Sequence, residues 1–196
     1  MYGPSVRGPM ATMTARAGPL LPLLLLAGAV PIRSAAQEPA STPLSAPTPT
    51  PDELKARERH AILNVRTVLL AGKTYAASNG SLFGELACLT NPASCGGAYP
   101  ADAPFPLDPT YDWEGVKLGY DRRFHPGPKA TEEEARRARA APGSLKAFAY
   151  TAAPVKAGET GLRAFCSDSS GRFCVSSDGR EPSVKAGRCD PCQKLE

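Results

Sequence analysis

Histidines, long apolar runs and an excess of one charge are scarce in this sequence. Among 196 residues there are two histidines, His60 and His125, which leaves few options for histidine-based catalysis or metal binding. Charged residues make up 21% and the net charge is +4. This balance excludes an acidic disordered tail and a strongly basic nucleic-acid-binding protein. The apolar run at 19–30 has only 12 residues, two of them prolines, whereas a membrane span needs about 20.

Proline and glycine are, in contrast, abundant. The chain has 21 prolines and 18 glycines, which is more than an average protein contains, so part of it is not expected to belong to a folded core. The length suits one domain of ordinary size with extensions.

The first 36 residues are typical of a secretory signal peptide. They contain Arg7, Arg16 and Arg33 and no acid, and small residues precede Gln37, where we expect cleavage. Met10 and Met13 are alternative starts, and the competing interpretation is a membrane anchor. Cleavage lowers the net charge from +4 to +1. We therefore expect a periplasmic, secreted or cell-surface protein with no membrane span after cleavage and no nucleic-acid partner.

All six cysteines follow the signal segment, and an even number in an exported protein predicts disulfides. They are Cys88, Cys95, Cys166, Cys174, Cys189 and Cys192. Six cysteines allow 15 pairings, and spacing suggests the three local ones, Cys88–Cys95, Cys166–Cys174 and Cys189–Cys192.

The mature chain divides into a proline-rich linker at 37–51 and an α+β domain at 52–192. Five prolines in the linker predict an extended spacer. A helix is expected from about 52 to 78, because apolar or small residues recur there at steps of three and four. Its stripe consists of Ile62, Val65, Leu69, Gly72 and Ala76. Its polar first turns suggest that one end projects while the other packs on a sheet.

The C-terminal half predicts an antiparallel sheet of three to four strands. Segments at 120–124, 145–153, 161–166 and 172–176 alternate or contain β-formers. Gly171 and Gly179 are placed in turns, the first at the hairpin position that needs a positive φ. Thr131 and Glu134 form a capping box that opens a short helix.

The order of these motifs resembles type IV pilin-like and pseudopilin-like proteins. The resemblance rests on Gly115-Val-Lys-Leu-Gly-Tyr120, on Phe148-Ala-Tyr-Thr-Ala-Ala-Pro154, on the stretch 158–172 followed by Ser177-Asp-Gly179, and on a helix similar to Ile62–Tyr75. It covers about residues 54–180. It implies a long N-terminal helix packed on the antiparallel sheet, stapled by disulfides.

One departure from that family is clear. The chain has no prepilin peptide ending in glycine before a Phe-Thr-Leu-Ile-Glu type helix. The sequence therefore looks like a pilin headgroup exported as a soluble protein.

No residue is predicted to be catalytic, to bind a cofactor or to bind a metal. Cys189-Asp-Pro-Cys192 suggests redox chemistry only if a helix start lowers the thiol pKa, and a zinc site would need four cysteines at unusually wide spacing. We expect His60 to be solvated and His125 to lie in a loop. Tyr111 and Trp113 are expected in the core, with an adhesive aromatic patch as the alternative.

The predicted function is therefore non-enzymatic. The resemblance implies protein–protein or surface interaction, in a bacterial pilus, in type II secretion or in cell adhesion. The partners would be pilus or secretion-machine components or a surface receptor. The alternative is a secreted disulfide-rich binding or inhibitor-type module unrelated to pili, with cysteine-closed loops as its contact surface.

Overall fold

The computed structural model describes residues 48–97, 99–100 and 102–192. The predicted signal peptide at 1–36 and the linker up to residue 47 lie outside the described residues. None of the helices described is long and apolar enough to cross a membrane.

The long helix α1 (Pro51–Ser78) is the first element described, with fifty residues before it. It begins with a capping box, in which Thr50 accepts from the Glu53 amide and Glu53 accepts from the Thr50 amide, and Asn79 caps its end. Its bounds agree with the predicted helix to within one residue. The helix packs along its whole length, because buried residues run from Leu54 to Ala76. The expectation that its first turns project was wrong.

The sheet has five strands in a simple meander, β1-β2-β3-β4-β5, and every neighbouring pair is antiparallel. The strands are β1 (Gly115–Lys117), β2 (Tyr120–Pro126), β3 (Phe148–Pro154), β4 (Ala164–Asp168) and β5 (Phe173–Ser176). The prediction of three to four strands missed β1. That strand has only three residues and mostly exposed side chains, so it lacks a readable alternation. It pairs with β2 through Leu118-Gly119, both with positive φ, as a two-residue hairpin turn requires.

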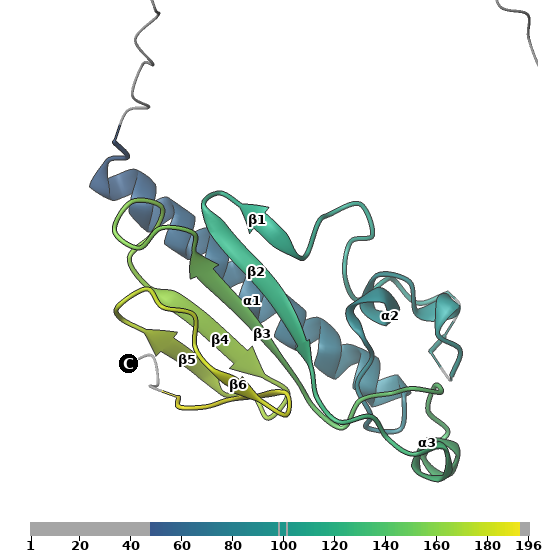
Figure 1. Cartoon of the computed structure of the whole chain (residues 1–196). Coiled ribbons are helices and arrows are strands. Elements are labelled where there is room, and N and C mark those ends of the chain that lie inside the picture. The colour runs from purple at the N-terminus through teal and green to yellow at the C-terminus, as the bar shows by residue number, and fades with distance from the viewer. Residues whose placement is uncertain (1–47, 98, 101, 193–196) are drawn as a thin grey trace, which may run out of the picture. The chain divides into compact units, whose positions relative to one another are not determined.

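Helix α1 covers one face of the sheet (Figure 1). Val65, Phe148, Tyr150 and Phe165 are fully buried between them. Gly72 makes the close approach possible, because a Cβ there would lie only 2.4 Å from the Phe148 ring. The core of this α+β fold therefore lies between α1 and the central strands.

A short C-terminal hairpin covers the opposite face. It consists of β6 (Val184–Lys185) and β7 (Arg188–Cys189), and β7 contacts β3 and β4. Figure 1 shows β6 on the side of the sheet away from α1. The sheet is thus the middle layer of three.

Three short elements lie near the edge beyond β1 and near the end of α1. They are α2 (Leu86–Thr90), the 3-10 turn η1 (Pro92–Ser94) and α3 (Glu132–Ala138). The predicted capping box of Thr131 and Glu134 opens α3. Glu134 also accepts from Lys146, and these hydrogen bonds lower the pKa of its carboxyl to about 2.

Candidate functional site

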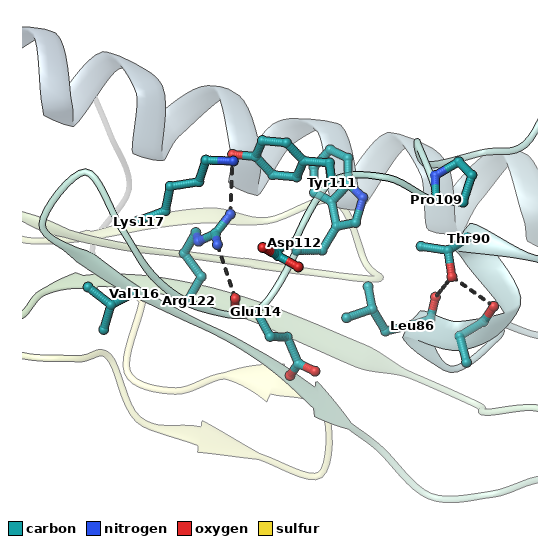
Figure 2. A pocket seen from close by; sticks show the side chains of 11 residues that line it. Leu86, Thr90, Pro109, Tyr111, Asp112, Glu114, Val116, Lys117 and Arg122 are labelled. Carbon is teal, nitrogen blue, oxygen red and sulfur yellow. Dashed lines mark hydrogen bonds between the residues drawn. The ribbon is translucent and has the colours of Figure 1, made fainter.

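A cleft of about 640 Å³ opens beside β1, between the loop before that strand and helix α2 (Figure 2). Its lining mixes aromatic, cationic and acidic side chains, among them Tyr111, Trp113, Lys117, Arg122 and Asp112. Tyr111 and Trp113, the two aromatic residues singled out in the sequence, both line it.

The loop at 108–114 is shaped by local hydrogen bonds. The Asp108 carboxylate accepts from the amide and the hydroxyl of Thr110, each at 2.8 Å, an Asx turn. These bonds, the backbone one first, lower the pKa of Asp108. The Trp113 indole donates to the Asp108 carbonyl at 2.9 Å, and the Tyr150 hydroxyl donates to the Trp113 carbonyl. The loop is thereby fixed to β3, and its aromatic side chains form a wall.

Arg122 is the central cation of the cleft and is only 1% exposed. Its guanidinium donates to the Gly115 carbonyl at 3.1 Å, to the Glu114 carbonyl at 3.0 Å and to the Tyr111 hydroxyl at 3.2 Å. No carboxylate oxygen of the described residues lies within 4.0 Å of it. Buried guanidinium groups are normally paired with an acid. The charge of Arg122 is instead stabilised by two backbone carbonyls and a hydroxyl.

A hydrogen-bonded chain links Arg122 to the long helix. The Tyr111 hydroxyl donates to Asn64 Oδ1 at 3.1 Å, and the Asn64 amide lies 2.9 Å from His60 Nδ1. Burial, followed by the charges of Arg122 and Lys117, lowers the pKa of His60. His60 was predicted to be solvated, whereas in the structure it is partly buried.

A cation and an aromatic ring lie against each other in the cleft. The Lys117 Nζ lies 3.6 Å from the Tyr111 ring centroid, a cation–π contact. On the opposite wall, the Thr90 hydroxyl donates to the carbonyls of Leu86 and Ala87. The lining therefore offers no nucleophile with an adjacent base. Tyr111 and Trp113 are both partly buried, so their predicted core position is only partly correct.

The structure brings together three chemically suggestive residues on the other face of the sheet. His125 Nε2 lies 2.8 Å from the Thr151 hydroxyl, which donates to Glu181 at 2.7 Å. In a catalytic triad the acid binds the imidazole nitrogen that faces away from the nucleophile. Here Glu181 approaches the same Nε2, at 3.5 Å, and Thr151 is fully buried. The cluster holds the segment after β5 to the sheet, and sequence reasoning missed it because its members are 26 to 56 residues apart.

All six cysteines form disulfides, as predicted, but two pairings were wrong. Cys88–Cys95 was expected and is present. The others are Cys166–Cys189 and Cys174–Cys192, not Cys166–Cys174 and Cys189–Cys192. Cys166 and Cys174 are paired in register on β4 and β5, and the C-terminal segment crosses the face onto which both project. Each strand cysteine therefore meets a partner from that segment.

These disulfides also decide two earlier alternatives. No thiol is free among the described residues, so the CxxC segment is not a dithiol and the four cysteines hold no zinc. No group of three or more His, Cys, Asp or Glu in the described part of the chain is placed to hold a metal ion.

The residues of the predicted helix stripe and turns have the following places in the structure. Val65 and Gly72 are buried on α1, and Ile62 and Leu69 are partly buried against the core. Gly171 and Gly179 have φ values of +91° and +74° and lie in the turns that follow β4 and β5.

Comparison with known proteins adds no family to this description. No protein-family model, no curated protein and no solved structure matches the chain. The function must therefore be argued from its own geometry.

Proposed function

We propose that this chain is an exported, non-enzymatic, pilin-like protein that acts by binding other proteins at a bacterial surface, in a pilus or in a type II secretion assembly. The observation that carries the proposal is helix α1, 28 residues long, packed along its length against an antiparallel sheet. A loop-dominated inhibitor module would not have such a helix. The motifs of the resemblance fall on this framework in order, at β1–β2, at β3 and at the β4–β5 hairpin.

Two further observations support export and binding rather than catalysis. Three disulfides are typical of proteins that fold in an oxidising compartment. Neither the cleft nor the Thr151 cluster combines an accessible nucleophile with a base and an orienting group.

The alternative, a secreted binding module unrelated to pili, is favoured by a different feature. The loop closed by Cys88–Cys95 shares a hollow with Tyr99 and Phe105, and Phe105 is 54% exposed. Such a protruding aromatic residue is a common anchor in interfaces.

Cell fractionation tests the proposal. The full chain with a C-terminal tag is expressed in its source cells, and its mass is measured with and without reduction. We expect a product that starts at Gln37, has no free thiol, and co-purifies with sheared surface filaments or with pseudopilins. A chain without residues 1–36 is the control for export. A freely diffusing monomer in the medium would support the alternative, and an uncleaved cytoplasmic product would contradict both.

A further inference from the structure

The face of α1 that points away from the sheet carries a seven-residue repeat. Ala56, Leu63, Leu70 and Ala77 are seven residues apart and all exposed. Leu63 and Leu70 are 61% and 66% exposed, high values for leucine in a helix that is otherwise packed on a core. This apolar row extends over most of the helix.

A second row of the same period runs beside it. It consists of Arg59, Arg66 and Lys73, which are also exposed. Taken together, the residues of the two rows follow one another at steps of three and four through three seven-residue repeats. This spacing averages 3.5 residues, which is the period of helices that pair side by side. The two rows thus form one continuous strip, which we call the outer strip of α1.

The cations of the outer strip are not neutralised within the protein. None of the three forms an ion pair within 4.0 Å among the described residues, and 59–78 contains no acid. Arg66 lies 5.3 Å from the Phe173 ring centroid, and Lys73 lies over Gly171 in the β4–β5 turn. The basic row therefore borders the β5 side of the helix.

The other border of the outer strip is a groove. It is about 370 Å³ in volume and lies between α1 and the loop around Phe105, with Thr67, Leu70, Thr74 and Tyr99 in its walls. An occupant of the strip would therefore have apolar walls on one side and three positive charges on the other.

Charge decides among the possible occupants. A second copy would bring Arg59, Arg66 and Lys73 against an identical row or against leucine. The acids of α1 lie outside the strip, because Asp52 and Glu53 are in the first turn and Glu58 is buried in a pair with Arg163. A membrane surface would meet only two leucines, whereas interfacial helices insert a broad apolar face. A helix with acidic side chains fits both the period and the charge.

We propose that the outer strip of α1 binds an amphipathic helix of another protein. This partner places Asp or Glu against Arg59, Arg66 and Lys73, and small or apolar side chains against Leu63 and Leu70. The inference rests on the proposed function as a protein-binding module and adds the chemistry of the partner.

A displayed library of 28-residue helices tests it. Each library peptide has an uncharged helical sequence in which the positions along one face, spaced at steps of three and four, are randomised. The library is selected for binding to the purified secreted protein. We expect enrichment of Asp and Glu at one row and of Leu or Ala at the other. The variant Arg59→Glu/Arg66→Glu/Lys73→Glu should select Lys and Arg instead, and should bind a wild-type-selected peptide at least tenfold more weakly.

Three other exposed cations provide a matched control. Arg139→Glu/Arg180→Glu/Lys185→Glu changes the charge equally away from α1, and it should select the same acidic peptides as the wild type. Circular dichroism verifies that both triple variants are folded. Leu63→Ser should weaken binding of the selected peptide by a similar factor.

Three outcomes would overturn the inference: no enrichment of acids, peptides that bind the charge-reversed variant equally well, or binding abolished by the control variant. Flotation with vesicles containing 30% phosphatidylglycerol is run in parallel. Strip-dependent vesicle binding without acidic enrichment would assign the strip to a membrane surface. Because the selection uses purified protein, it can succeed or fail independently of the fractionation experiment.

Discussion

The two faces of the central sheet are held to their covering layers by different means. On the α1 face, fully buried apolar and aromatic side chains such as Val65, Tyr150 and Phe165 fill the interface. On the opposite face, two disulfides and the buried carboxylate of Asp168 hold a hairpin whose strands are two residues each. A long helix buries enough apolar surface to stay in place, whereas a short polar hairpin does not and depends on crosslinks and ion pairs.

The largest expected effect is on the α1 face. Phe148→Ala should lower the free energy of unfolding by about 3–5 kcal/mol, because the Phe148 ring fills the space above Gly72, stacks on Phe124 and meets the Phe83 ring edge to face. Guanidinium denaturation with the disulfides intact measures it. Phe124→Ala is the control and should cost less, since Phe124 is only partly buried. Equal losses would show that this core is not centred on Phe148.

The second prediction concerns the disulfides that hold the C-terminal hairpin to the opposite face. Cys166→Ala/Cys189→Ala should cost about 2–4 kcal/mol, because the unfolded chain gains freedom over a separation of 23 residues. Hydrogen exchange should become fast at β6–β7 while α1 stays protected. The control variant Cys88→Ala/Cys95→Ala removes a disulfide whose cysteines are seven residues apart. In this variant, hydrogen exchange at β6–β7 should not change. Loss of protection in α1 of the first variant would mean that the two faces are not independent.

A smaller effect is expected at Asp168, the ionic part of the same face. Its carboxylate accepts from the Cys189 amide at 3.1 Å and faces Arg172 at 3.2 Å and Arg188 at 3.8 Å. Asp168→Asn should cost about 1–2 kcal/mol, because both arginines are partly exposed and screened. Asp178→Asn, at an exposed pair with Arg180, should cost clearly less, because solvent screens that pair. Equal costs at the two sites would show that burial adds nothing to the pair.

The sequence predicts the parts of this fold that depend on local signals. The bounds of the long helix, the capping box at Thr131 and the Cys88–Cys95 loop each depend on residues close together in the chain, so composition and spacing suffice. The disulfide partners of Cys166 and Cys174 depend on where the distant C-terminal segment packs. The two-residue period of a strand predicts the sheet face on which each cysteine lies, but it does not predict the cysteine that it pairs with.

The cleft shows the same limit. Arg122 alternates in phase with Tyr120 and Phe124, which is a signal for an inward position. Arginine is so rarely buried that the signal was overlooked. The outer strip of α1 was missed for another reason: its seven-residue rows are interleaved with the stripe of Ile62, Val65, Leu69 and Gly72, and only exposure separates them.

The smallest expected effect compares one histidine from each face. Burial is the main cause that lowers the pKa of both His60 and His125, and Glu181 partly opposes it at His125. The unfolded chain therefore binds more protons below about pH 6.5, so stability should be complete above that pH and fall as the pH drops through it. Unfolding curves between pH 8 and pH 6 measure the slope.

His60→Gln and His125→Gln should each flatten that slope, and the double variant should remove most of it. Stability that rises toward pH 6 in the wild type would contradict a lowered pKa at the two histidines.

The placement of Cys189 and Cys192 has a consequence for the order in which the protein matures. Both partner strands precede them in the chain, so a polypeptide that emerges with its N-terminus first presents Cys166 and Cys174 before their correct partners exist. During that interval the only partners at hand for these two thiols, apart from the Cys88–Cys95 pair, are each other. Native closure therefore needs Cys189 and Cys192, and a product truncated before Cys189 leaves Cys166 and Cys174 without their native partners.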